Sequence, residues 1–235
     1  AERVEGEGVV LVRNEDGALP LPAGTDRVNV FGWASTQWVG SGSGSGQVTG
    51  SVTGLLDALS ERGVEYNAEL TDMYRSFYGE RAWKGSGALN SHDTEYCRLY
   101  EPRLDDPTCY SETLLKNAEA YSDTAIVVIG RVSGESIDCP NAQYKVRDRG
   151  GALTIDATRG YLELSSEEEA LLAYVGATYE HVVVVVNSTN TMELGQLETI
   201  PGIDAALLAG PTGEVGARAV ASVLWGDTNP SGRTT

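Results

Sequence analysis

An acidic turn follows an apolar run in the second half of the chain. The run Ala125–Ile129 leads to Arg131, and the next residues deliver Gly134, Glu135 and Asp138. Open α/β sheets place ligand sites at the carboxyl ends of their strands, which is where this turn is expected. Gly134 tolerates many backbone angles, so Glu135 can be aimed freely. A carboxyl group at the mouth of a pocket serves as a general acid when burial raises its pKa. On these residues alone, the alternative is an exposed carboxylate paired with Arg131.

A glycine-rich segment offers amides and hydroxyls. Residues 40–46 have the sequence Gly-Ser-Gly-Ser-Gly-Ser-Gly, between an expected strand, Val28–Phe31, and an expected helix, Val52–Arg62. Such turns hold dinucleotide phosphates on backbone N–H groups. However, no register gives G-x-G-x-x-G, and no G-K-[ST] follows. The segment is therefore either a loop that contacts a polar ligand or a plain solvent-exposed loop.

The charge balance excludes some classes of partner. The chain has 17 Lys and Arg against 34 Asp and Glu, a net charge of −17. Such a surface repels phosphate backbones and anionic membranes, so we expect no nucleic-acid partner. The apolar run Val182–Val186 is far shorter than the roughly 20 residues of a membrane helix, so no membrane span is expected.

The metal-binding residue types are few and scattered. His92 and His181 stand apart from each other and from any cysteine pair, so both are expected to be structural or exposed. No C-x-x-C pair occurs among Cys97, Cys109 and Cys139, although one Cys97–Cys109 bridge is possible. We expect no metal site and no cofactor.

Short β-branched runs alternate with helical stretches, which predicts an α/β fold with a mainly parallel sheet. The expected strands are Val28–Phe31, Ala125–Ile129, Val182–Val186 and Ala205–Leu208, and the expected helices are Val52–Arg62, Thr113–Tyr121, Ser166–Thr178 and Glu214–Leu224. Because Val182–Val186 is apolar on both faces, it belongs at the centre of the sheet. The prediction is a single domain over residues 1–235: a three-layer sandwich with a roughly six-stranded, mostly parallel sheet and helices on both faces.

Local signals mark the boundaries of some elements. Ser165 or Ser166 followed by Glu168 or Glu169 is a capping-box pattern that predicts the start of the third helix, and Gly63 is a plausible stop for the first. Two stretches, residues 79–111 and 141–160, break the alternation and are expected to be long loops that are functional or cover the fold.

Four segments, in order along the chain, resemble family 3 glycoside hydrolases. They are Gly8 to Leu21, with Leu-Pro-Leu at its end; Val28 to Gly32 followed by Gly44-Ser45-Gly46; Arg131 to Asp138, with the pattern R-x-x-G-E-x-x-D; and Gly210 to Glu214 with Leu224 to Arg233, which contains Asn-Pro-Ser-Gly-Arg. In that family a barrel domain carrying an Asp nucleophile is complemented by an α/β sandwich. The resemblance identifies this chain with the sandwich.

The resemblance also implies roles for individual residues. Glu135 matches the general acid/base, and Ser45, within the loop that contains Gly44, matches a serine that hydrogen-bonds the sugar in the −1 site. Independently of the resemblance, Trp38 lies just before this loop, and an aromatic side chain there would stack on a sugar at the rim of the site, with simple packing as the alternative. Arg131 and Asp138 are expected to hold the turn together.

The family's nucleophile motif of the S-D-W type is missing, so the barrel domain is absent from this chain. The opening directly in the sandwich fits either a chain order with the sandwich first or an excised segment. The predicted function is retaining, β-glucosidase-type hydrolysis of O-glycosidic bonds. Its partners would be a β-linked glucoside or related glycoside and the barrel domain of the same enzyme. The alternatives are a non-catalytic carbohydrate-binding or structural module and a nucleotide-binding domain, which the failed phosphate motifs disfavour.

Overall fold

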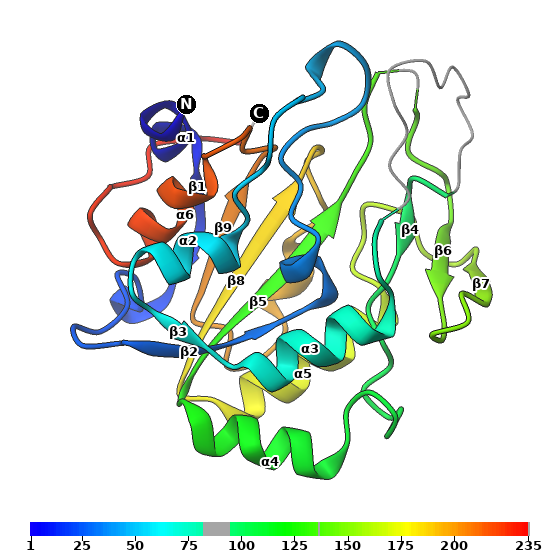
Figure 1. The fold of residues 1–235 in the computed structure, drawn as a ribbon, viewed down its shortest axis with the longest axis horizontal. Helices are drawn as coiled ribbons and strands as arrows, with labels where there is room; N and C mark the ends of the chain where they lie inside the picture. Colours follow the sequence, from blue (N-terminus) through cyan, green and yellow to red (C-terminus); the bar gives the residue numbers. More distant parts are fainter. Residues whose placement is uncertain (82–94, 136, 235) are drawn as a thin grey trace.

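The computed structural model describes residues 1–81, 95–135 and 137–234. Within these ranges six strands form one sheet: β1 (Val10–Asn14), β2 (Arg27–Phe31), β3 (Glu65–Tyr66), β5 (Thr124–Arg131), β8 (His181–Ser188) and β9 (Ala205–Ala209). Their order across the sheet is β1-β9-β8-β5-β2-β3, and every pair is parallel except β1 with β9 (Figure 1). The predicted α/β fold with a mostly parallel, six-stranded sheet is confirmed.

The two central strands are the most completely buried. All eight residues of β5 are buried, and β8 is buried from Val182 to Ser188. The two strands pair in parallel from Thr124 with His181 to Arg131 with Ser188. Strands buried on both faces are built from continuous β-branched runs, so the predicted central place of Val182–Val186 is confirmed.

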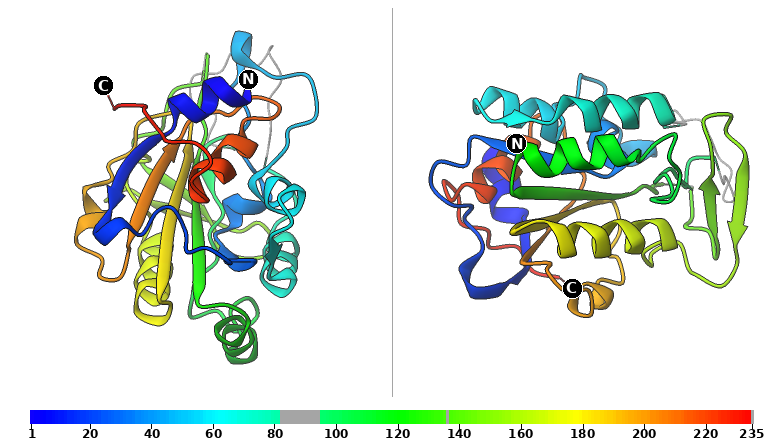
Figure 2. Two further views of the ribbon diagram at one scale, coloured as in Figure 1. Left: turned by 90° about the vertical axis from the view of Figure 1, so that its left-hand side faces the viewer. Right: turned by 90° about the horizontal axis from the view of Figure 1, so that it is seen from below.

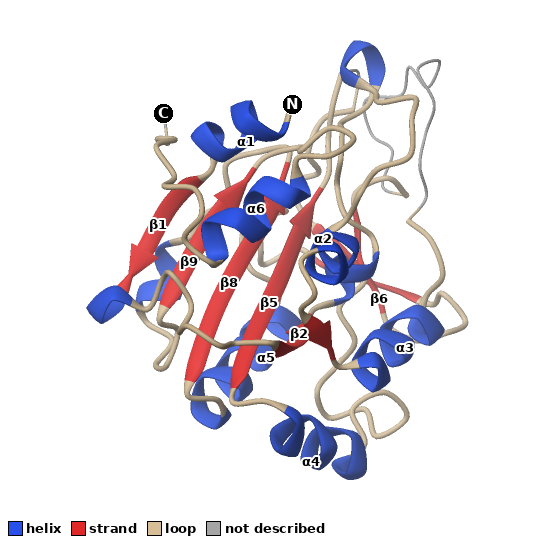
Figure 3. Ribbon diagram, turned by 60° about the vertical axis from the view of Figure 1, so that its left-hand side comes forward, coloured by secondary structure: helices blue, strands red, loops and turns tan. Residues whose placement is uncertain are grey.

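Helices cover both faces of this sheet. Helices α2 (Leu55–Glu61) and α6 (Ala217–Leu224) pack on one face, and α3 (Ala68–Phe77), α4 (Glu112–Tyr121) and α5 (Ser166–Thr178) on the other (Figure 3). Successive strand residues point to opposite faces. Val183 and Val185 therefore meet α2 and α6, while Val182 and Val184 meet α3, α4 and α5. Helix α1 (Glu2–Gly8) packs beside α6.

The predicted capping box is present at the start of α5. The Ser165 Oγ accepts a hydrogen bond from the Glu168 N–H at 3.2 Å, and the Glu168 Oε2 accepts one from the Ser165 N–H at 2.8 Å. Helix α2 ends before Gly63, whose φ of +80° is open to glycine at little cost. Helices α2 and α6 each begin three residues later than predicted, at Leu55 and Ala217.

Helix α3 was missed by the sequence prediction, although its signal is present. Leu70, Met73, Tyr74 and Phe77 are buried and follow the i, i+3, i+4, i+7 spacing of an amphipathic helix. The Asn67 side chain caps the helix by accepting a hydrogen bond from the Glu69 N–H at 3.0 Å.

The prediction that residues 79–111 and 141–160 are loops is wrong in part. They contribute β4 (Arg98–Leu99), β6 (Gln143–Val146) and β7 (Leu153–Asp156), which form a three-stranded sheet within the described residues. Strand β4 pairs with β6, more than 40 residues away in the sequence, and such pairing leaves no local signal.

The chain order of the strands creates a topological switch point. From β2 the chain moves outward to β3, and it then returns to place β5 on the opposite side of β2, followed by β8 and β9. The connections that follow β2 and β5 therefore diverge at the carboxyl ends of these two strands. Open α/β sheets bind ligands in the crevice at such a point. None of the described helices is long and apolar enough to cross a membrane.

Candidate active site

The glycine-rich loop extends beyond the carboxyl ends of β2 and β5 (Figures 1 and 2), and the turn that carries Glu135 contacts it there. The Ser45 N–H donates a hydrogen bond to the Glu135 Oε2 at 2.7 Å. The Ser43 Oγ donates one to the Glu135 backbone oxygen at 2.9 Å. The structure thus brings Glu135, Gly44 and Ser45 together, although about 90 residues separate them in the sequence.

Close contact between the two segments depends on glycine. Gly44 has a φ of +73°, and a Cβ placed there would lie 2.4 Å from the Glu135 Oε2 and 2.5 Å from its Cβ. A Cβ on Gly134 would lie 2.3 Å from the Ser43 nitrogen. Both separations are shorter than van der Waals contact, so any larger residue would push the two segments apart.

The Glu135 turn is fastened to the loop that follows β8. The Ser133 N–H donates to the Thr189 Oγ1 at 2.7 Å, and the Ser133 Oγ donates to the Asn190 Oδ1 at 2.5 Å. Asp138 is exposed, and its carboxylate forms no hydrogen bond or ion pair with a described residue. The expectation that Asp138 holds the turn together is therefore not met. It lines a cavity of about 420 Å³ together with Ser133, Thr189 and Asn190.

Arg131 belongs to the scaffold beneath this turn. Its side chain is fully buried, and both of its terminal nitrogens donate to the Glu168 carboxylate at 2.6 Å. It also donates to the backbone oxygens of Tyr161 at 2.7 Å and Glu163 at 2.8 Å. Its expected role in holding the turn agrees with these contacts, whereas the alternative pairing of Glu135 with Arg131 is absent.

Trp38 has a different place from the one predicted at the rim of a sugar site. Its side chain is only 7% exposed and packs in the core under α2. Its Nε1 donates to the Thr212 Oγ1 at 2.8 Å. Trp38 therefore packs in the core, as in the alternative considered from the sequence.

Hydrogen bonding controls the charge of Glu135. The carboxyl is exposed, and the bond from the Ser45 N–H, followed by that from the Ser45 side chain, holds its pKa below the ordinary value. These bonds stabilise the charged form of the carboxyl. A general acid needs the opposite shift. In the chain alone, Glu135 is therefore an exposed, ionised carboxylate without the raised pKa of a proton donor.

The remaining metal-binding residue types are scattered within the described part of the chain. Among the described residues, no group of three or more His, Cys, Asp and Glu side chains is arranged to hold a metal ion. Cys97, Cys109 and Cys139 are all free thiols, so the possible Cys97–Cys109 bridge is not formed. His181 begins β8, and His92 lies outside the described residues.

Glu101 is a perturbed carboxyl that the sequence reasoning missed. Burial raises its pKa to about 8. Its Oε2 accepts from the Trp33 N–H at 2.8 Å, and its Oε1 accepts from the Tyr110 hydroxyl at 2.6 Å. Glu101 therefore holds the chain where it leaves β2. Its position inside a stretch predicted to be loop gave no signal of this role.

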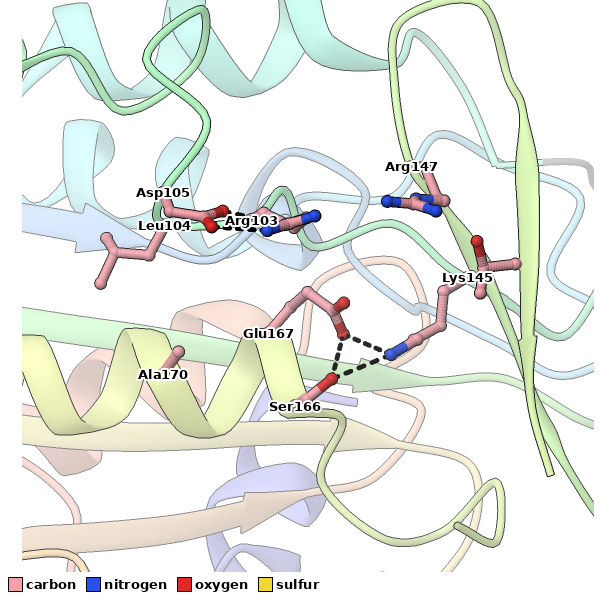
Figure 4. Close-up of a pocket in the computed structure, with 9 residues that line it drawn as sticks. Arg103, Leu104, Asp105, Lys145, Arg147, Ser166, Glu167 and Ala170 are labelled. Carbon is pink, nitrogen blue, oxygen red and sulfur yellow. Dashed lines mark hydrogen bonds and ion pairs between the residues drawn. The ribbon is translucent and has the colours of Figure 1, made fainter. Parts of the chain in front are cut away.

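A cleft of about 660 Å³ lies between β6, β7 and the start of α5 (Figure 4). Lys145 pairs there with Glu167 at 3.0 Å, and Arg103 pairs with Asp105. The cleft shares no lining residue with the Glu135 turn or the glycine-rich loop. The volume of this cleft alone does not identify it as an active site.

Comparison with known proteins gives a consistent result. A curated beta-glucosidase from Ruminococcus albus is 28% identical over 239 residues, which cover 99% of this chain and 22% of that protein. A solved beta-glucosidase from Paenibacillus barengoltzii matches 97% of this chain and 23% of its own, at 26% identity and a TM-score of 0.71. Beta-glucosidase 3B from Thermotoga neapolitana, in complex with alpha-D-glucose, matches 97% of this chain and 29% of its own, at 25% identity and a TM-score of 0.69.

The chain thus spans less than a third of each of these relatives. Residues 9–235 match the family described as the glycosyl hydrolase family 3 C-terminal domain. This match covers nearly the whole chain, and it agrees with the mostly parallel sheet and with the order of the motifs. The chain belongs to the C-terminal domain of glycosyl hydrolase family 3.

Proposed function

We propose that this chain supplies the general acid/base, Glu135, to a retaining, β-glucosidase-type glycoside hydrolase. The observation that carries the proposal is the meeting of Glu135 with Gly44 and Ser45 at the switch point of the sheet. The named relatives are beta-glucosidases, and the chain covers only 22% to 29% of their lengths. The remainder of the enzyme would include a barrel domain carrying the Asp nucleophile.

The mechanism divides two carboxyl groups between two domains. Retaining glycosidases hold them about 5–5.5 Å apart, one as nucleophile and one as acid and then base. Glu135 would protonate the oxygen of the leaving group while the nucleophile forms the glycosyl-enzyme. It would then take a proton from the water that releases the sugar. Ser45 would hydrogen-bond the sugar beside it, and neither step requires a cofactor.

Assembly with the barrel supplies the shift in pKa that Glu135 lacks in the chain alone. Its carboxyl is exposed, with its pKa lowered by Ser45. A barrel domain and a β-linked glucoside packed over the turn would remove water from the carboxyl. Desolvation disfavours the charged form and raises the pKa toward the range that proton donation needs.

The decisive experiment replaces Glu135 with Ala in the full-length enzyme. Hydrolysis of natural glucosides, which have poor leaving groups, should slow by about 10²–10⁴-fold. A nitrophenyl glucoside needs little protonation, so its glycosyl-enzyme should still form and accumulate. Azide should then restore turnover and give the β-glycosyl azide. Asp138→Ala is the matched control, because it removes an exposed carboxylate from the same turn.

Three results would contradict the proposal. An inverted α-azide would identify Glu135 as the nucleophile. Near-parental rates on natural glucosides would make it a bystander. Turnover of an aryl β-glucoside by the isolated chain would show that the site is not divided between domains. If the gene has no barrel with an Asp nucleophile beside this segment, the non-catalytic module becomes the better reading.

A further inference from the structure

Asn187 lies at the carboxyl end of β8, and its side chain is enclosed, with 1% exposed. Its Oδ1 accepts a hydrogen bond from the Val39 N–H at 2.6 Å. Its Nδ2 donates to the Val39 oxygen at 3.1 Å and to the Gly210 oxygen at 3.0 Å. One amide therefore joins two loops that leave the sheet from different strands.

Val39 is the base of the glycine-rich loop and is fully buried. The residues on either side of it are tied to the loop that follows β9. The Gly40 oxygen accepts from the Gly213 N–H at 2.7 Å, and the Trp38 Nε1 donates to the Thr212 Oγ1 at 2.8 Å. The loop therefore starts from a fixed point above β8 and β9, although it comes from β2.

From that point the loop runs back over the end of β5. A Cβ on Gly42 would lie 2.9 Å from the Ser133 oxygen, so the loop rests directly on the chain that carries Glu135. Three residues further on, the Ser45 N–H meets the Glu135 carboxylate. A displacement at Val39 would therefore be passed along a short, closely packed segment to this contact.

We propose that Asn187 is a positioning residue for Glu135, acting through the base of the glycine-rich loop and the Ser45 N–H. Its meaning for catalysis rests on the proposed function, whereas the positioning itself does not.

The chemistry of the side chain explains why an amide suits this place. Asn187 supplies an acceptor for one N–H and donors for two carbonyl oxygens, all in a buried setting. Alanine would leave these three backbone groups unpaired, and leaving a buried polar group unpaired is costly. Aspartate would keep the acceptor but would face two carbonyl oxygens with a negative charge.

The first test measures position through the titration of Glu135 by NMR. In the Asn187→Ala chain, the Glu135 carboxyl should titrate at a higher pH than in the parent, because it loses a well-placed Ser45 N–H. The Val39 and Ser45 amides should exchange about tenfold faster or more. An unchanged Glu135 titration together with full protection at Val39 would overturn the proposal.

Two controls separate positioning from simple loss of stability. Leu172→Ala removes a fully buried side chain on α5, on the opposite face of the sheet, and should destabilise the fold without moving the Glu135 titration. Asn117→Ala removes an exposed amide contact to Glu69 and should change neither property. If Asn187→Ala does not fold, Thr212→Val provides a second test, because it removes the hydrogen bond that holds Trp38, the residue before Val39. It should shift the Glu135 titration in the same direction, and no shift would overturn the proposal.

The second test uses the full-length enzyme. Asn187→Ala should lower kcat on natural glucosides by about 10²-fold with little change in KM, because misplacement of a catalytic group by about 1 Å has effects of that size. Nitrophenyl glucosides should be affected less. A shifted Glu135 titration without this dependence on the leaving group would support positioning by Asn187 and contradict the acid/base role of Glu135. An unshifted titration would contradict positioning whatever the kinetics.

Discussion

Two glutamates below the carboxyl edge of the sheet, Glu168 and Glu101, have surroundings opposite to those of Glu135, which lies above that edge. Glu168 is buried against Arg131, where β5 ends, and Glu101 is enclosed by Trp33 and Tyr110, where the chain leaves β2. Glu135 is exposed, and within the described residues its hydrogen bonds are to the glycine-rich loop. Glu168 and Glu101 fix the origins of the two loops, and the loops then present Glu135. Under the proposed function, the same residue type would serve as scaffold where it is enclosed and as a reactive group where it is exposed.

The largest effect should follow from breaking the scaffold at Glu168. Glu168→Ala would leave the fully buried Arg131 without its carboxylate, and loss of one partner of a buried ion pair costs about 3–5 kcal/mol. Urea denaturation measures this as a lower free energy of unfolding. Arg218→Ala, which breaks an exposed pair with Glu61, should cost far less. Equal losses of unfolding free energy in the two variants would show that burial does not make the Arg131–Glu168 pair more important for stability than the Arg218–Glu61 pair.

Glu101 should make stability depend on pH. Burial raises its pKa to about 8 from the ordinary value of 4.5, so the folded state keeps a proton that the unfolded chain releases. Stability from this group is therefore complete below pH 4.5 and is lost as pH rises toward 8. The slope should approach about 1.4 kcal/mol per pH unit inside that window.

Glu101→Gln provides the test of that slope. Glutamine keeps the shape and the hydrogen bonds of the protonated acid but cannot ionise. The variant should therefore gain stability relative to the parent between pH 5 and 8, as measured by thermal unfolding at each pH. Parallel stability curves for the two proteins would show that Glu101 is ionised in the fold.

A smaller effect on stability is expected where the glycine-rich loop contacts Glu135. Gly44→Ala places a side chain at a φ of +73° and against Glu135, which costs about 1–2 kcal/mol for the left-handed backbone alone. The variant should also release Glu135 from Ser45 and bring its titration back toward the ordinary value. Gly46→Ala is the matched control, because Gly46 has open space around it and no positive φ.

The sequence predicted those parts of the molecule whose signals are local. The valine run of β8, the capping box at Ser165 and the Gly-Glu turn after β5 each lie within a few neighbouring residues, and their structures match. The pairing of β4 with β6 and the enclosure of Glu101 depend on residues distant in the sequence. Trp38 was misplaced for a related reason, because its partner Thr212 lies 174 residues further along the chain.

The smallest effect on stability is expected from a substitution at Glu135 itself. Glu135→Gln removes an exposed charge that has no partner within the scaffold, so the free energy of unfolding should change less than in Glu168→Ala, Glu101→Gln or Gly44→Ala. The sign of its pH dependence is nevertheless defined. Ser45 lowers the pKa of Glu135, so its contribution is present above the unfolded pKa and is lost as pH falls through the folded one.

Parent and Glu135→Gln should therefore have similar stability near neutral pH and converge further under acid conditions, as followed by thermal unfolding from pH 7 to 3. In the full-length enzyme the same substitution should nearly abolish hydrolysis of natural glucosides while leaving the unfolding midpoint unchanged. A loss of activity without a loss of stability would show that Glu135 is specialised for chemistry, and Glu168 and Glu101 for structure. A marked fall in stability in Glu135→Gln would instead place Glu135 in the scaffold with Glu168 and Glu101, because a group used only for chemistry contributes little to holding the fold together.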